Sequence, residues 1–163
     1  MEKKFDIIIY GASGFTGSLG AKYIEKYTDK ISWAIAGRNF NKLQKLQEQL
    51  KSRPEIIVAD GNDEEALIKL TQSTKVVASY AGPFNKYSNL LVKACVKTST
   101  HYVDITGEAI WVRDLIDDYH QECIEKKIKI IPACGYDSIP SDIGTFFTCL
   151  LYTSDAADDM ASG

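Results

Sequence analysis

Three glycines punctuate the segment Gly11-Ala12-Ser13-Gly14-Phe15-Thr16-Gly17, which directly follows a short apolar run. Gly11 suits a tight turn at positive φ, Gly14 leaves the backbone open to a phosphate, and Gly17 lets a following helix pack closely. Amides at the start of that helix attract a pyrophosphate, and two hydroxyls add donors. A plain strand-to-helix turn is the alternative, but the strand-before, helix-after context favours dinucleotide binding. The residues predicted to bind the pyrophosphate are Gly11, Ser13, Gly14, Phe15, Thr16 and Gly17.

Arg38 and Lys42 follow the second apolar run, where NAD-binding domains carry an acidic residue for the ribose 2′-hydroxyl. No carboxylate stands there. A guanidinium at that position can hold a 2′-phosphate through paired hydrogen bonds, and Lys42 adds charge. The alternative is a solvated loop cation and a helix-surface lysine. The pattern predicts NADP (NADPH) as the cofactor and disfavours NAD.

Asp60, ending the third run, is predicted to lie at the edge of the adenine ring. The alternative is that its side chain accepts a hydrogen bond from its own backbone in a turn.

The ends of the later apolar runs supply the remaining candidates, because ligands of open α/β sheets bind at the carboxyl ends of strands. Near the nicotinamide ribose we expect Ala81, Gly82 and Pro83.

None of the nine tyrosines has a lysine four residues later, which excludes the Tyr-Lys pair of short-chain dehydrogenases in its usual form. The catalytic residues stay unknown, and the candidates for an acid or base are Asp104, Glu108, Tyr136 and Asp137. For each of them a cap, turn or packing role is the alternative.

Six short apolar runs must position these residues, at 5–10, 32–36, 55–59, 75–81, 101–105 and 129–132. Helical spacing between them predicts a doubly wound parallel sheet of the Rossmann type, with strand order 3-2-1-4-5-6. Acidic residues at 63–65 are placed to open the third helix. Two apolar stripes are expected to pack on the sheet: Leu43, Leu46 and Leu50, and then Ile110, Leu115, Ile116, Tyr119 and Ile124.

Composition narrows the class of protein. The 163 residues suffice for one well-buried core, and the four cysteines form no cluster with either histidine, so no metal site is predicted. The formal charge of −3 and the absence of a basic block argue against a nucleic-acid partner. With no signal-like segment and no apolar run of membrane-spanning length, we expect an intracellular, cytoplasmic location.

The last fifteen residues, 149–163, break with this pattern. Their start, CLLYTSDAAD, resembles a translated sequencing adapter, and we expect a non-native tail after a native domain at 1–148. A genuine disordered acidic tail is the alternative. Without Asp155, Asp158 and Asp159 the charge is zero, since 19 acidic side chains then balance 19 basic ones.

Two segments, YVDITGE at 102–108 and CGYDSIPSD at 134–142, together with the glycine loop and Arg38, resemble the saccharopine dehydrogenase-like oxidoreductases. The resemblance covers residues 5–147 and is strongest to the branch that includes the trans-acting enoyl reductases. It implies an NADP-binding domain that leads, from about residue 138, toward a substrate domain missing here.

The resemblance also implies hydride transfer to or from a lipid-related or other small-molecule substrate held through the missing domain. It further implies possible membrane or lipid-droplet association of the full-length parent. A non-catalytic NAD(P)-binding regulator or scaffold is the alternative, because a fold and a cofactor site do not establish turnover. Homo-oligomerisation stays open.

Overall fold

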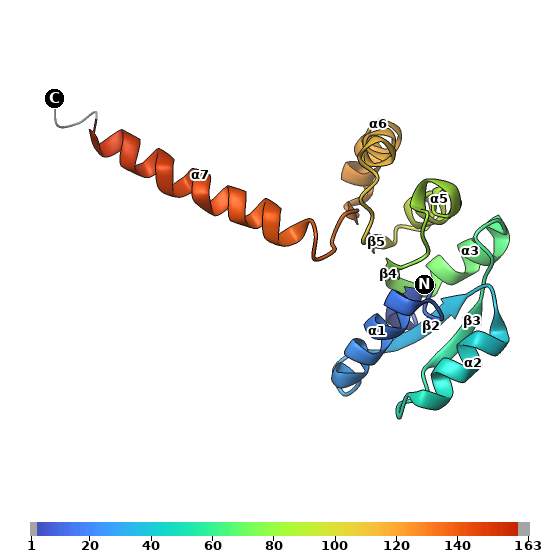
Figure 1. Cartoon of the computed structure of the whole chain (residues 1–163). Helices are drawn as coiled ribbons and strands as arrows, with labels where there is room; N and C mark the ends of the chain where they lie inside the picture. The colour runs from blue at the N-terminus through green and yellow to red at the C-terminus, as the bar shows by residue number, and fades with distance from the viewer. Residues whose placement is uncertain (1–2, 160–163) are drawn as a thin grey trace.

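The computed structural model describes residues 3–159 and contains one sheet flanked by helices (Figure 1). In chain order its elements are β1 (Phe5–Tyr10), α1 (Phe15–Ile24), the 3-10 turn η1 (Glu25–Tyr27), β2 (Trp33–Gly37), α2 (Phe40–Gln49), β3 (Glu55–Val58), α3 (Glu64–Gln72), β4 (Thr74–Ser79), α4 (Phe84–Tyr87), α5 (Asn89–Lys97), β5 (His101–Asp104), α6 (Ala109–Lys126), β6 (Ile130–Ile131) and α7 (Ile139–Asp159).

The sheet has six parallel strands in the order β3-β2-β1-β4-β5-β6, which confirms the predicted doubly wound fold. The order reverses at β1, which pairs with β2 on one side and β4 on the other. At such a reversal the chain leaves neighbouring strands toward opposite faces of the sheet, which opens a crevice between the two loops. The strand order therefore positions the glycine loop after β1 at the mouth of that crevice.

Successive residues of β1 divide the core into two layers. Ile8 belongs to the cluster that contains α3, α5 and α6 side chains, and Ile9 belongs to the cluster with α1 and α2. Both isoleucines are almost completely buried, as expected for a central parallel strand covered on both faces. Leu43 and Leu46 pack from α2 as predicted. Asp63 caps α3 by accepting a hydrogen bond from the Ala66 amide at 3.0 Å.

The apolar stripe predicted on α6 is wrong for three of its members. Ile110, Ile116 and Ile124 are 82%, 47% and 57% exposed, whereas Trp111 and Leu115 form the buried side of the helix. The reason lies in the position of α6 at the edge of the sheet, above β5 and the two-residue β6. Only a narrow side of the helix meets the sheet there, so the rest of its apolar surface faces solvent.

The chain after β6 forms the long helix α7, which projects away from the sheet and its flanking helices (Figure 1). Residues 149–159 continue this helix, and residues 160–163 lie outside the described residues. Their non-native origin stays a prediction. None of the helices within 3–159 combines the length and apolar character needed to cross a membrane.

Candidate functional site

A cleft of about 240 Å³ lies where β1, β2, β3 and β4 end. It gathers seven of the residues predicted to bind the cofactor, namely Gly11, Ser13, Gly14, Arg38, Asp60, Ala81 and Gly82. The remaining lining residues are Tyr10, Gly37, Gly61, Tyr80 and Tyr87, which the sequence did not single out. Residues from four strand ends thus meet in one concave site at the reversal of the strand order.

The glycines of the first loop face different constraints. Gly11 has φ +75°, and a Cβ there would lie 2.9 Å from the Ala81 amide nitrogen. A Cβ on Gly17 would lie 2.3 Å from the Gly11 carbonyl oxygen, closer than any real contact. Gly14 is different, because its nearest neighbour would be the Gly11 carbonyl oxygen at 3.4 Å, an ordinary contact distance. The folded loop itself therefore requires glycine at 11 and 17 and tolerates a side chain at 14.

The start of α1 points free amide donors toward the loop. Gly14 is the N-cap residue, and its amide donates to the Gly11 carbonyl at 3.0 Å. Ser18 donates to the Gly14 carbonyl, which makes it the first amide of α1 with a helical partner. Among the described residues no side chain caps this helix. The amides of the first turn and the positive end of the helix dipole are thus directed at the site where an anion would bind.

Three charged or polar side chains, those of Tyr10, Arg38 and Asp60, line the cleft where β1, β2 and β3 end. Arg38 is exposed directly after β2, and none of the ion pairs found within residues 3–159 involves it. Asp60 Oδ1 accepts a hydrogen bond from the Asn62 amide at 2.9 Å, so the predicted turn contact exists although Asp60 also lines the cleft. Burial, with a smaller contribution from the charge of Asp60, raises the pKa of Tyr10 to about 12. Tyr10 is therefore neutral at physiological pH.

Five predicted cofactor residues lie outside the cleft lining. Phe15 is exposed on the first turn of α1, and Gly17 is buried beneath the loop. Thr16 faces a neighbouring groove. Lys42 is exposed on α2, where its amide is held by the Asn39 side chain at 3.0 Å. Pro83 is exposed after a cis peptide bond at the start of α4.

Tyr10 and Tyr80, which the sequence did not single out, form part of the cleft wall. Tyr80 packs against α1 so tightly that a Cβ on Gly20 would lie 2.8 Å from its hydroxyl. Tyr10 donates a hydrogen bond to the Ala59 carbonyl at 3.3 Å, which ties β1 to the end of β3. Each follows from its place at a strand end. That placement is the only signal in the sequence that could have indicated them.

Asp104 holds together the carboxyl ends of β5 and β6. Its Oδ1 accepts from the amides of Thr106 and Ala133 at 2.9 and 3.0 Å, and its Oδ2 accepts from the Tyr102 hydroxyl at 2.9 Å. Burial raises the pKa of this carboxyl despite those bonds. Its acceptors are occupied within the fold, so the geometry gives Asp104 a structural role and favours the alternative that the sequence left open.

Glu108 caps a helix, though not the one that follows it. Its two carboxylate oxygens accept hydrogen bonds from the Phe84 and Asn85 amides at 2.8 and 2.9 Å, at the start of α4. The other two acid or base candidates, Tyr136 and Asp137, are exposed on the loop before α7, and Tyr136 is 89% exposed. None of the four candidates lines the cleft formed by the glycine loop.

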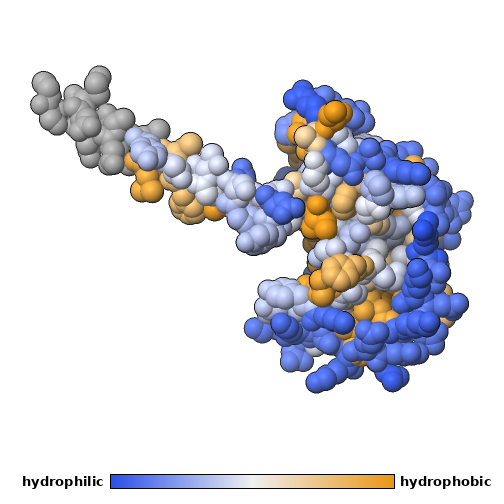
Figure 2. Space-filling model, in the orientation of Figure 1, coloured by the Kyte–Doolittle hydropathy of each residue, from blue (hydrophilic) through white to orange (hydrophobic). Residues whose placement is uncertain are grey.

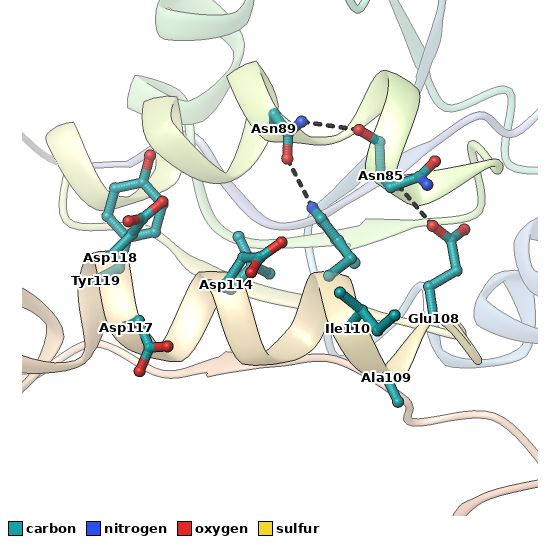
Figure 3. Close-up of a pocket in the computed structure, with 11 residues that line it drawn as sticks. Asn85, Asn89, Glu108, Ala109, Ile110, Asp114, Asp117, Asp118 and Tyr119 are labelled. Carbon is teal, nitrogen blue, oxygen red and sulfur yellow. Dashed lines mark hydrogen bonds between the residues drawn. The ribbon is translucent and has the colours of Figure 1, made fainter.

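A larger cavity of about 910 Å³ lies between the α4–α5 region and α6 (Figure 3). Several carboxylates face it, and some of its polar groups pair within the fold: Asn89 accepts from the Trp111 indole at 2.6 Å, and Asp117 pairs with Arg113 at 2.8 Å. Within the part of the chain that the structure describes, no group of three His, Cys, Asp or Glu side chains is arranged to hold a metal ion.

Residues 7–131 match the family model described as the saccharopine dehydrogenase NADP binding domain. A lipid droplet localized protein of Caenorhabditis elegans is 34% identical over 153 residues, which cover 88% of this chain and 36% of that protein. A trans-acting enoyl reductase of Mycobacterium tuberculosis is 36% identical over 148 residues, covering 89% of this chain and 35% of that protein. The chain thus spans about a third of the length of these curated relatives.

Solved structures support the same fold. Apo saccharopine dehydrogenase (L-Glu forming) from Saccharomyces cerevisiae aligns with a TM-score of 0.69 at 24% identity, over 82% of this chain and 28% of that one. A short-chain dehydrogenase/reductase from Vibrio parahaemolyticus aligns with a TM-score of 0.63 at 18% identity, over 77% of this chain and 82% of that one. At these identities the likeness concerns the fold alone.

Proposed function

The chain belongs to the saccharopine dehydrogenase NADP binding domain family, and from this premise we propose that its cleft at the ends of β1 to β4 binds NADP(H). The observation that carries the assignment is the open space beside Gly14. The fold tolerates a side chain there, yet the chain has a glycine that leaves the amides of α1 accessible. A pyrophosphate would occupy this space, held by the first-turn amides and the Ser13 hydroxyl.

Arg38 is the proposed determinant for the 2′-phosphate. It lines the cleft, it is exposed, and it follows β2 at the position where a carboxylate would select NAD. A guanidinium can hold a phosphate through two parallel charge-assisted hydrogen bonds. Lys42 lies outside the cleft lining, so we assign it at most a supporting charge. Asp60, beside Arg38 and Tyr10, is proposed to border the adenine.

For the whole protein we propose an NADP-dependent oxidoreductase that acts on a lipid-related or other small-molecule substrate. NADPH, when bound, supplies a hydride for reduction of such a substrate. The names of the enoyl reductase and lipid droplet relatives support the class and the lipid link. We also propose that groups outside this domain hold the substrate, because the chain spans about a third of those relatives. A cytoplasmic location, with lipid-droplet association of the parent, is part of the same proposal.

One observation favours a second candidate, a non-catalytic NADP-binding regulator. Both carboxylate oxygens of Asp104 and of Glu108 accept structural hydrogen bonds, and neither residue lines the cleft, so this domain provides no acid or base from either of them beside the proposed cofactor site. The two functions separate in an assay of the full-length protein with NADPH and enoyl, keto or imine substrates, followed by absorbance of the reduced nicotinamide. Tight NADPH binding without oxidation would favour the regulator.

The cofactor assignment is tested with Arg38→Asp. We expect the Kd for NADPH to rise about 10- to 100-fold, because a charge-assisted hydrogen bond contributes about 1.5–3 kcal/mol and each 1.4 kcal/mol is tenfold. The Kd for NADH should change much less. Fluorescence titration with both nucleotides measures this. The matched control is Lys45→Asp, the same charge change at an exposed position of α2 outside the cleft. Equal loss of NADPH and NADH binding would contradict the assignment.

A further inference from the structure

An apolar groove of about 580 Å³ runs along the sheet beside α1. Its walls include Ile7, Leu19, Tyr23, Ala78, Val103 and Ile105, from α1, three strands and the loop after β5. Helices α1 and α2 cover only the β1–β2–β3 side of this face, so no helix within residues 3–159 covers the part over β4 and β5. Figure 2 shows hydrophobic side chains gathered on the hollowed face from which α7 emerges.

Helix α7 carries a matching apolar stripe. Ile139, Ile143, Phe146 and Phe147 recur at the spacing of one helix face, and all four are exposed. Among the described residues, the stripe-bearing part of α7 at 139–147 has no hydrogen bond or ion pair with the sheet or its flanking helices beyond its first turn, and α7 stands away from the body in Figure 1. The stripe is complete before residue 149, so it does not depend on the origin of the residues that follow. An exposed apolar stripe of this size normally has a partner surface.

The path of the chain after β6 leads into the groove. The Ala133 and Cys134 amides donate to Asp104 Oδ1 and to the Asp104 carbonyl, at 3.0 and 2.7 Å, which draws the chain from β6 back over β5. Cys134 itself lines the groove, and a Cβ on Gly135 would lie 3.3 Å from Ile105 Cβ. The chain is thus anchored at the groove wall only a few residues before α7 begins at Ile139.

We propose that α7 docks into this groove of its own chain through the stripe formed by Ile139, Ile143, Phe146 and Phe147. Residues 135–138 are the hinge, and four extended residues reach about 13 Å, enough to place the first turn of α7 over β5. Burial of apolar surface on both partners drives the closure. A second apolar groove, of about 550 Å³, lies between α6 and β6 beside Ile116 and Ile124. The anchoring at Asp104 turns the chain away from it.

Docking has a consequence for the cofactor cleft, and this consequence rests on the proposed function. Tyr80 lines both the cleft and the groove, so it forms the wall between them. A docked α7 brings the hinge residues Tyr136 and Asp137 toward that wall, beside the cleft. Tyr136 and Asp137, the two acid or base candidates that are exposed before α7, would then border the bound cofactor.

The test is small-angle X-ray scattering of the 163-residue chain without nucleotide, with light scattering to fix its mass. A helix of 21 residues is about 31 Å long, so a projecting α7 increases the maximum dimension by an amount on the order of 20–30 Å over a docked one. We expect the compact value for the monomer. The variants Phe146→Asp, on the stripe, and Leu19→Asp, on the half-exposed groove wall, should each restore the longer dimension.

Ile124→Asp, at a similarly exposed position of the other groove, is the matched control and should leave the compact form unchanged. Circular dichroism of each variant separates release of α7 from unfolding. The proposal is overturned by an extended wild-type monomer, by a dimer that exchanges α7, or by release in Ile124→Asp but not in Leu19→Asp. Because no nucleotide is present, failure here leaves the NADPH titration with Arg38→Asp as an independent measure of the proposed function.

Discussion

At the residue scale, the three glycines of the loop after β1 have distinct physical reasons to be glycine. Gly11 adopts a positive φ, and Gly17 lies so near the Gly11 carbonyl oxygen that a Cβ would overlap it. Gly14 has an ordinary extended backbone, with φ −77° and ψ 169°, and room for a methyl group. The fold accounts for the first two glycines, and the proposed phosphate accounts for the third.

This difference predicts opposite effects of two alanine substitutions. Gly17→Ala should lower the free energy of unfolding by about 1–3 kcal/mol or more, because the methyl group overpacks against backbone. Gly14→Ala should leave stability within about 0.5 kcal/mol of wild type and raise the NADPH Kd at least about tenfold. Urea denaturation and fluorescence titration measure the two quantities. Gly107→Ala, where a Cβ meets nothing within 4 Å, serves as the neutral control. Normal NADPH binding by Gly14→Ala would refute the phosphate role.

At the element scale, one carboxylate joins three strands near their amino ends. Asp6 in β1 accepts hydrogen bonds from the amide and hydroxyl of Ser32, just before β2, at 2.8 and 2.9 Å. Its other oxygen pairs with Lys75 of β4 at 2.7 Å. The hydrogen bonds from Lys75 and Ser32 lower the pKa of Asp6 to about 2. The same central strand that carries the glycine loop at one end is thus tied to both neighbours at the other.

The lowered pKa predicts how this link depends on pH. The unfolded-state pKa of Asp is about 3.9, so the carboxylate of Asp6 stabilises the fold above about pH 4. This contribution is lost as the pH falls toward about 2, where Asp6 becomes protonated in the folded state as well. The stability difference between wild type and Asp6→Asn, from urea unfolding at a series of pH values, should shrink over that window. A difference that stays constant from pH 5 to 2 would disprove the charge effect.

At the scale of the whole molecule, the cleft is built from loops after four strands, β1 to β4, on both sides of the reversal in strand order. A ligand in it contacts both halves of the sheet, so binding is linked to global unfolding. The two apolar grooves lie elsewhere, one beside α1 and one beside α6. The groove beside α1 is the proposed position of α7.

Because only the folded protein binds the cofactor, the increase in the free energy of unfolding on NADPH binding can be predicted. NADPH at about 100 times its Kd should raise the free energy of unfolding by about 2.7 kcal/mol, since only the folded state binds it. NADH at the same concentration should give a much smaller increase. Urea denaturation with and without each nucleotide measures the difference, and Arg38→Asp should remove most of the NADPH effect. An equal gain from both nucleotides would contradict a 2′-phosphate site.

The sequence by itself determined the features that depend on neighbouring residues and on pattern. The loop at 11–17 and the acidic start of the third helix at 63–65 need only local conformation, and the alternation of apolar runs with helical segments leaves few sheet topologies. The strand order and the meeting of Gly11, Arg38 and Asp60 at one edge follow from that topology. Membership of an NADP-binding family is consistent with those same local motifs.

Only the tertiary structure decided the roles of residues whose hydrogen-bond partners are distant in the sequence. Glu108 caps a helix that begins at Phe84, and Asp104 holds Ala133, contacts across more than twenty residues that no local pattern encodes. The exposure of Ile110 likewise depends on where α6 lies on the sheet and not on its own spacing. Side-chain chemistry shows what a residue can do, but burial and partners are properties of the assembled fold. A strand-end carboxylate in sequence therefore became a structural anchor once its neighbours were in place.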